Sequence, residues 1–295
     1  MPDATRGDGL RTFLLTAIAM LAFAANSLLC RLALQRSGID PASFGSVRLL
    51  SGALMLGVIV RLRATTPASS AAPVRADWLA AAMLFGYVAF FSFAYLSLSA
   101  GTGALILFGA VQLTMFGAGL RSGSERFGVL GWFGFVMAVG GLVYLVSPGI
   151  SAPPLLGAVL MAIAGVAWGV YSLRGRGVAD PLAATARNFT RALPLALGLS
   201  LVFAARAHAD AMGLVLAAAS GALTSGLGYA VWYAVLGRLG AMRAATVQLS
   251  VPLLAAFGGV LFLSEAITPR LVAASVAILG GIALVLGQKG RSARP

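Results

Sequence analysis

The chain contains two segments that repeat one another at a fixed spacing. Ser124–Glu125 begins an apolar run that carries Gly140–Gly141, and 140 residues later Ser264–Glu265 begins another that carries Gly280–Gly281. A shared motif at one offset indicates an internal duplication. Each copy holds five apolar runs, and five is an odd number. A chain that crosses a bilayer five times begins its second copy on the opposite side, so the two halves must be inverted relative to each other.

The length and number of these runs predict the fold class. A bilayer core of about 30 Å needs about 20 apolar residues as a helix. Hydrophobic residues make up 60% of the chain and charged ones 10%, against about 25% charged in a soluble domain. We therefore predict an all-α membrane protein of ten transmembrane helices, in two inverted five-helix repeats that divide at 1–150 and 151–295. The expected spans are residues 12–34, 42–60, 78–98, 102–120, 127–147, 154–173, 182–204, 212–236, 242–263 and 269–287.

The net charge of +13 has a one-sided distribution along the chain. With ten spans both termini share one side, and fourteen Lys and Arg residues fall on that side against three in the opposite links. The positive-inside rule then places both termini in the cytoplasm. Because the charge follows the topology, we expect the lipid bilayer and a small-molecule substrate as partners, and no nucleic acid. The chain is expected to be a monomer or a weak dimer.

All eight acidic residues lie in links or at the ends of runs. A proton-driven exporter usually holds an ionisable group inside the bilayer, because a buried acid can exchange its proton for substrate. His208, the only histidine, also lies in a link. We therefore expect no membrane-embedded proton relay. The chain also lacks a phosphate-binding loop for ATP and any set of haem or metal ligands, so we expect no cofactor, no metal and no enzymatic activity.

Five further charged residues lie within or beside the runs. Glu125 and Glu265, each preceded by a serine, are predicted to stabilise the first turns of the helices that they begin. Arg48, Arg187 and Arg191 lie inside runs, where the sequence offers no carboxylate in the membrane. Snorkelling, bonding to backbone carbonyls and binding of a substrate anion all fit these arginines.

Polar and aromatic side chains lie deep in several runs, too far from the ends for an interfacial belt. Gln112 and Gln248 occupy equivalent places in the two copies, so an inverted pseudo-twofold axis would set them symmetrically near the centre. Packing between helices and lining of a cavity both explain such residues. We predict a substrate cavity whose apolar, aromatic wall suits an uncharged or zwitterionic solute with apolar bulk. The predicted substrate-binding residues are Asn26, Tyr87, Phe91, Gln112, Trp168, Tyr171, Tyr229, Trp232 and Gln248.

Glycine and proline indicate where the helices could bend. Gly101 and Gly103 fall in the short link between the third and fourth runs, and Gly237 and Gly240 fall in the corresponding link of the second copy. Pro252 interrupts the ninth run, where it removes a backbone hydrogen bond and predicts a kink. We predict hinge roles for these five residues.

Ten spans in two halves, each half closing on Ser-Glu followed by Gly-Gly, resemble the drug/metabolite transporter superfamily, and in particular its ten-helix branch with EamA-type repeats. Within that branch the chain is similar to the YddG-type aromatic amino acid exporters of bacteria. The resemblance implies a bacterial inner-membrane transporter with a cavity formed largely by the first, third, fourth, sixth, eighth and ninth helices. The small multidrug members carry an acid in the first helix, where this chain has Ala, Asn and Ser, so their proton exchange is not expected here.

The resemblance and the candidate cavity residues together favour an alternating-access exporter of amino acids, aromatic or bulky and apolar, and of related metabolites. One alternative keeps the fold and exchanges nucleotide sugars or phosphate esters. That alternative requires several cationic residues in one cavity, and Arg48, Arg187 and Arg191 are the available ones. A non-transporting membrane scaffold is the third reading, although it leaves the inverted repeat without a role.

Overall fold

The apolar runs form helices because a segment in lipid must satisfy its backbone hydrogen bonds internally. The computed structural model describes residues 3–63, 77–123 and 127–292, and within these ranges every regular element is helical, apart from one isolated bridge between Ile39 and Ala209. The elements are α1 (Asp3–Arg36), α2 (Pro41–Arg63), α3 (Trp78–Ala94), α4 (Ala100–Arg121), α5 (Val129–Val146), α6 (Leu155–Arg174), α7 (Pro181–Val202), η1 (Ala204–Arg206), α8 (Ala211–Ala219), η2 (Ser220–Leu227), α9 (Gly228–Gln248), α10 (Ser250–Leu263) and α11 (Pro269–Ser292).

Ten helical segments run through the bundle within the described ranges, and eight of them are long and apolar enough to cross a membrane. Two of these eight combine several elements: Ala211–Leu239 joins α8, η2 and part of α9, and Arg243–Leu263 joins the rest of α9 to α10. The remaining two segments are α3, which is shorter, and α7, which carries two arginines. The predicted all-α membrane fold is confirmed.

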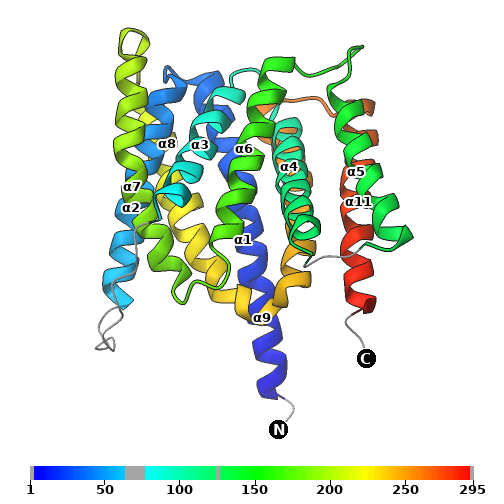
Figure 1. Ribbon diagram of the computed structural model, residues 1–295. Coiled ribbons are helices and arrows are strands. Elements are labelled where there is room, and N and C mark those ends of the chain that lie inside the picture. The colour runs from blue at the N-terminus through cyan, green and yellow to red at the C-terminus, as the bar shows by residue number, and fades with distance from the viewer. Residues whose placement is uncertain (1–2, 64–76, 124–126, 293–295) are drawn as a thin grey trace.

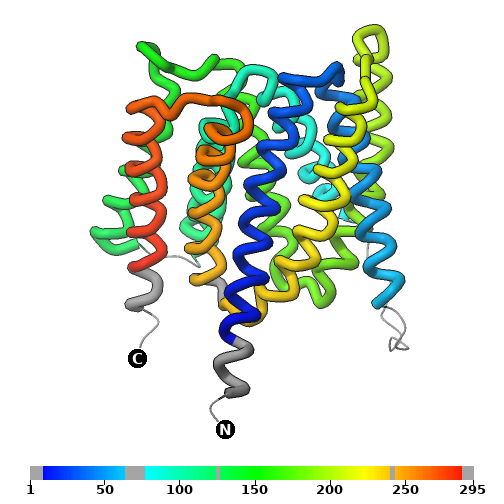
Figure 2. Tube along the Cα trace, turned by 180° about the vertical axis from the view of Figure 1, so that it is seen from behind, coloured from blue at the N-terminus to red at the C-terminus, as the bar shows by residue number. Residues whose placement is uncertain are grey.

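The packing of the helices follows an inverted twofold pattern. α3 and α4 pack on α6, while η2–α9 and α10, their counterparts in the second half, pack on α1. The pairs α2–α7, α4–α10 and α5–α11 each join a helix to its own counterpart. Figure 1 shows α5 and α11 paired at one side of the bundle, and Figure 2 shows α1 between the α8–α9 segment and α10. The two halves are therefore interleaved, and a boundary at residue 150 stays a prediction.

The second glycine of each repeated Gly-Gly pair lies where α5 and α11 cross. A Cβ at Gly281 would collide with the carbonyl oxygen of Gly134, and one at Gly141 would lie 2.8 Å from the Cβ of Ala277. Lipid tails give helices no hydrophobic reason to associate, so close backbone packing of small residues has to hold them together. The repeated motif thus joins the last helix of one half to the last helix of the other.

Both ends of the chain lie at the same end of the bundle, which we call the terminal end, and the opposite end is called the far end (Figure 1). The α6–α7 link also lies at the terminal end, whereas the α3–α4 and α10–α11 links lie at the far end. This arrangement agrees with an even number of spans. The orientation with the terminal end in the cytoplasm stays a prediction.

Candidate substrate-binding site

A cavity of about 830 Å³ lies between the two halves. Its inner wall consists of buried and half-buried side chains from α1, α3, α4, α6, α7, η2 and α9, and its rim includes Asp77, Arg174 and the exposed link residues 175–177. Because that link lies at the terminal end, the cavity opens there (Figure 1). Sites for small molecules have volumes of about 300–1,000 Å³, so the space suits one small organic solute.

All nine residues predicted to bind substrate line this one cavity. They come from five helices that the bundle brings together, and their binding role stays a prediction. Asn26 lies on α1, Tyr87 and Phe91 on α3, Gln112 on α4, Trp168 and Tyr171 on α6, and Tyr229, Trp232 and Gln248 on α9.

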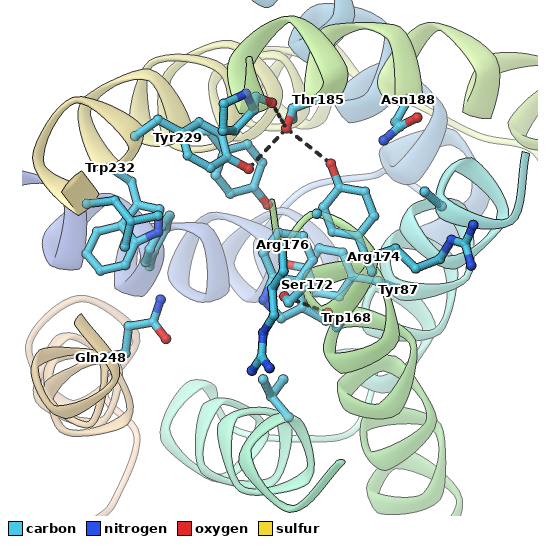
Figure 3. A pocket seen from close by; sticks show the side chains of 18 of the residues that line it. Tyr87, Trp168, Ser172, Arg174, Arg176, Thr185, Asn188, Tyr229, Trp232 and Gln248 are labelled. Carbon is cyan, nitrogen blue, oxygen red and sulfur yellow. Dashed lines mark hydrogen bonds between the residues drawn. The ribbon is translucent and has the colours of Figure 1, made fainter. Parts of the chain in front are cut away.

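Aromatic rings form a continuous wall around the middle of the cavity. Trp168 stacks on Tyr229 with ring centroids 5.5 Å apart and planes 15° apart, and on Tyr171 at 5.2 Å and 29°. Tyr87 packs against the other edge of this group, 4.9 Å from Trp168. Figure 3 shows Gln248 and Trp232 on one side of the space and Tyr87 and Trp168 on the other. Such a wall suits a flat apolar group.

Two networks of hydrogen bonds fix the polar groups in this wall. On one side Tyr87 Oη accepts from Asn26 Nδ2 at 3.1 Å and from Arg48 Nη2 at 3.0 Å. On the other side Tyr171 Oη bonds Thr185 Oγ1 at 3.2 Å, and that hydroxyl also bonds Tyr233 Oη at 3.0 Å (Figure 3). The tyrosine rings are therefore held in fixed orientations, as a preformed site requires.

The two repeat-equivalent glutamines both reach the cavity, from α4 and from the end of α9. Neither amide bonds any group in the part of the chain that the structure describes, and Figure 3 shows Gln248 directed into the open space. An amide carries both donors and an acceptor, so each glutamine can bind a polar group of a solute. The same part of the chain brings together no three His, Cys, Asp or Glu side chains that could hold a metal.

The mouth of the cavity is basic. Arg174, Arg176, Arg187 and Arg191 line it, with Asp77 as a carboxylate among them. Arg174 Nε donates to both oxygens of Asp77, at 3.0 and 2.8 Å. Partial burial acts to raise the pKa of the Asp77 carboxyl, but the hydrogen bonds from Arg174 and from the Ala80 amide outweigh it and hold the pKa below its usual value.

The far end of the bundle is closed by a second ion pair. Arg31 Nε lies 3.3 Å from Glu265 Oε1, and Arg31 Nη1 donates to the carbonyl oxygens of Tyr95, at 2.8 Å, and Leu96, at 3.2 Å. Glu265 Oε2 accepts from the backbone N–H of Ala100 at 2.8 Å, at the start of α4. The end of α1, the α3–α4 corner and the α10–α11 link are thereby tied together.

These contacts correct the role predicted for Glu265 in its own helix. α11 begins only at Pro269, and Thr268 Oγ1 accepts from the Leu271 N–H there. Glu265 instead follows Ser264, which ends α10 in a left-handed conformation with φ of 56°, and its carboxylate stabilises the N-terminus of α4. Glu125 lies outside the described residues.

The predicted hinge residues lie in three different surroundings. Gly101 and Gly103 belong to the first turn of α4 and not to the α3–α4 link; a Cβ at either would press on Ala256 or on the Tyr95 ring, so close packing accounts for both. Gly237 and Gly240 lie within α9. Their hinge roles stay predictions.

A break in the ninth span lies just before Pro252. α9 ends at Gln248 and α10 begins at Ser250, and Pro252 stands in the first turn of α10. A proline has no N–H to give to the carbonyl four residues before it, which is that of Gln248. This break lies beside Gln248, a residue of the cavity wall, and the kink and hinge role of Pro252 stay predictions.

Sequence reasoning missed several polar residues of the wall. η2 is a π-helix of eight residues, whose wider turn brings Thr224 and Ser225 to the cavity. Helices of this type are rare and are enriched at functional sites. Thr185, four residues after Pro181, joins the two tyrosines described above. A hydroxyl within an apolar run was the signal available for these residues.

A solute-sized cavity that lies between two interleaved, inverted sets of membrane helices, and opens at one end, defines a multi-pass membrane transporter. Residues 155–287, from the start of α6 into α11, match the EamA-like transporter family. An uncharacterized protein from Pseudomonas aeruginosa, PA1977, is 56% identical over 295 residues, which are all of this chain and 99% of that protein.

The chain belongs to the EamA-like transporter family, which confirms the predicted superfamily and the prediction that it is not an enzyme. A protein of known crystal structure is also similar over 93% of this chain and 96% of its own length. Its TM-score is 0.63 and its sequence is 19% identical, so the likeness concerns the fold alone.

Proposed function

We propose that the protein exports amino acids with aromatic or bulky apolar side chains, and related metabolites, across the inner membrane by alternating access. The observation that carries this proposal is the aromatic cavity, in which Trp168 and Tyr229 stack within 15° of parallel beside free amide groups. An aromatic wall suits the side chain of such a solute, and the two glutamines suit its charged backbone groups.

The shape of the cavity and the predicted topology support export as the direction of transport. The cavity opens at the terminal end, and the positive-inside rule assigns that end to the cytoplasm. A conformation that is open to the cytoplasm and tied at the far end by Arg31 and Glu265 matches the loading state expected of an exporter. Export then requires the far end to open and the mouth to close around the solute.

One specific observation favours phosphate-ester exchange as a second candidate. Four arginines line the mouth of the cavity, which is more than the sequence led us to expect there. Arginine binds phosphate through paired hydrogen bonds. The arginines lie at the mouth, however, while the deeper wall is aromatic, so an amino acid remains the better fit to the whole cavity.

Efflux from proteoliposomes separates the two candidates. Purified protein is reconstituted into liposomes that are loaded with labelled phenylalanine, labelled alanine or a labelled hexose phosphate. Efflux is then followed with no imposed pH gradient. We expect phenylalanine efflux to exceed alanine efflux and that of protein-free liposomes. Exchange of hexose phosphate without phenylalanine efflux would establish the second candidate instead. Faster phenylalanine efflux on addition of a proton carrier would contradict the absence of a proton relay, because proton-coupled efflux builds a pH gradient that opposes it.

A further inference from the structure

Arg48 is a buried cation without a counter-charge in the described part of the chain. Its side chain is 0% exposed, on α2 behind the cavity wall. Nε donates to Ser225 Oγ at 3.4 Å and Nη2 to Tyr87 Oη at 3.0 Å, while Nη1 is buried and has no hydrogen-bond partner. Neither of the two ion pairs in the described ranges involves it. A buried charge in this state is costly until an anion comes close to it.

The Tyr87 hydroxyl connects this charge to the cavity. Its oxygen accepts hydrogen bonds from Arg48 Nη2 and Asn26 Nδ2, both of which are donors only. The phenol proton must therefore go to a third group, and no residue in the described ranges accepts it. Because Tyr87 lines the cavity, that proton is left for an acceptor on a bound solute.

A neighbouring serine hydroxyl orients the Asn26 amide. Ser220 Oγ donates to Asn26 Oδ1 at 2.7 Å, while Thr224 Oγ1 gives its proton to the carbonyl oxygen of Ser220 at 2.6 Å. In this orientation the amide nitrogen of Asn26 faces Tyr87. Both hydroxyls belong to the π-helix η2, which packs directly on α2. The surrounding helices thus hold Tyr87 as a hydrogen-bond donor toward the cavity.

The chemistry of the acceptor follows from its neighbours. A positive charge in a poorly polarisable interior attracts an anion strongly, and hydrogen bonds to an ionised acceptor are about twice as strong as neutral ones. Arg48 lies 5.0 Å from the Phe91 ring centroid, and Phe91, Tyr87 and Trp168 form one apolar surface beyond it. A solute that fits has an anionic oxygen at one end and an aromatic body at the other.

We propose that Tyr87, polarised by Arg48, binds the carboxylate of the transported solute, so that the protein selects aryl carboxylates, of which aromatic amino acids are one case. Arg48 acts as a positioning residue, since it does not itself line the cavity. The inference rests on the proposed function for the identity of the solute, and the binding experiment below tests it separately from transport.

Thermal stabilisation of the purified, full-length protein tests the proposal. The probes are 3-phenylpropionate, its uncharged amide and phenyl phosphate, and the variants are Tyr87→Phe, Arg48→Gln and Arg48→Lys. Tyr144→Phe is the matched control, because this tyrosine is about half exposed on α5, outside the cavity. Labelled phenylalanine efflux, with phenylalanine amide as competitor, is measured in parallel.

We expect the wild type and Tyr144→Phe to bind the acid at least about tenfold more tightly than the amide, which is about 1.4 kcal/mol. Tyr87→Phe and Arg48→Gln should lose most of this preference, and Arg48→Lys should keep part of it. If Tyr87→Phe retains the preference for the acid over the amide, the proposal is overturned. This test does not depend on whether Arg48→Gln folds. Tighter binding of phenyl phosphate would overturn the assignment to carboxylates. A preference for the acid that depends on Tyr87, together with no phenylalanine efflux, would contradict the proposed amino acid cargo and support the carboxylate site.

Discussion

The two ends of the cavity are both marked by an arginine–carboxylate pair, yet one end is open and the other closed. At the terminal end Arg174 and Asp77 join the end of α6 to the start of α3, with side chains 43% and 32% exposed. At the far end Arg31 and Glu265 are 15% and 11% exposed and also bind carbonyls and an N–H at the α3–α4 corner. Both pairs bind a helix terminus, since Asp77 caps α3, but only the far-end pair is mostly buried and joins the end of α3 to the start of α4.

The two ends differ because their charged groups would have different partners after the ion pair separates. An exposed pair contributes about 0–1 kcal/mol, because water serves the separated charges almost as well. At the far end each charge satisfies backbone groups at helix ends, which are otherwise without partners. Opening that end exposes all of these groups together, so the far end should open as one unit.

The largest expected effect concerns which end faces the cytoplasm. A phosphatase that is active only in the periplasm should be inactive when fused after Arg294 and active when fused after Arg206. Arg206 ends η1, which follows α7 at the far end of the bundle. The charge distribution predicts this all-or-none contrast. Activity after Arg294 together with inactivity after Arg206 would reverse the orientation, and the cavity would then be an entry site for import.

The next effect tests the closed end. Glu265→Gln removes the charge that faces Arg31, and we expect the far end to open more often. A Gln248→Cys reporter in a Cys30→Ala background should then react from the far side with an impermeant thiol reagent on the order of tenfold faster, equivalent to about 1.4 kcal/mol. The control is Val272→Ala, an exposed position near the same end. Equal labelling rates in both variants would show that Glu265 does not hold this end closed.

A smaller effect is expected from the aromatic wall between the two ends. Trp168→Ala removes the stacking contacts with Tyr229 and Tyr171, each worth about 0.5–1.5 kcal/mol beyond burial, so kcat/KM for phenylalanine efflux should fall roughly tenfold. Trp132→Ala is the matched control on α5, where the side chain is about half exposed and outside the cavity, and it should change efflux by less than about twofold. Similar losses in both variants would indicate a general loss of packing.

The smallest effect is expected at the open mouth. Asp77→Asn keeps the cap on α3, because asparagine caps as well as aspartate, and removes only the ion pair. Thermal unfolding should show a loss below about 1 kcal/mol. The lowered pKa of Asp77 means that the pair contributes above the usual carboxyl pKa of about 3.9 and is lost as the pH falls through the lower folded value. The difference between variant and wild type should hold from about pH 5 to 8; a change near pH 6 would contradict it.

The sequence predicted those features that depend on local pattern and on the repeat. The length of the apolar runs predicts the helices, and the odd number of runs in each copy predicts the inversion. The position of Trp168 and Gln248 deep within their runs predicts that they line a cavity. It did not predict the partner of Glu265, because Ala100 is 165 residues away and its amide carries no sequence signal. The π-helix was missed for a related reason, since its wider turn lies where Gly221 packs on the Arg48 backbone. Long-range packing decides both.

The interleaving of the two halves has a consequence for how the protein is made. The first five helices leave the ribosome before the second five, and their most extensive neighbours (α6 for α3 and α4, α7 for α2, and α11 for α5) are not yet present. Until then Arg48 can contact Tyr87 and Phe91 of its own half but not Ser225 of the second half. Assembly must wait for nearly the whole polypeptide, so each molecule passes through a half-built intermediate in the membrane while it is synthesised.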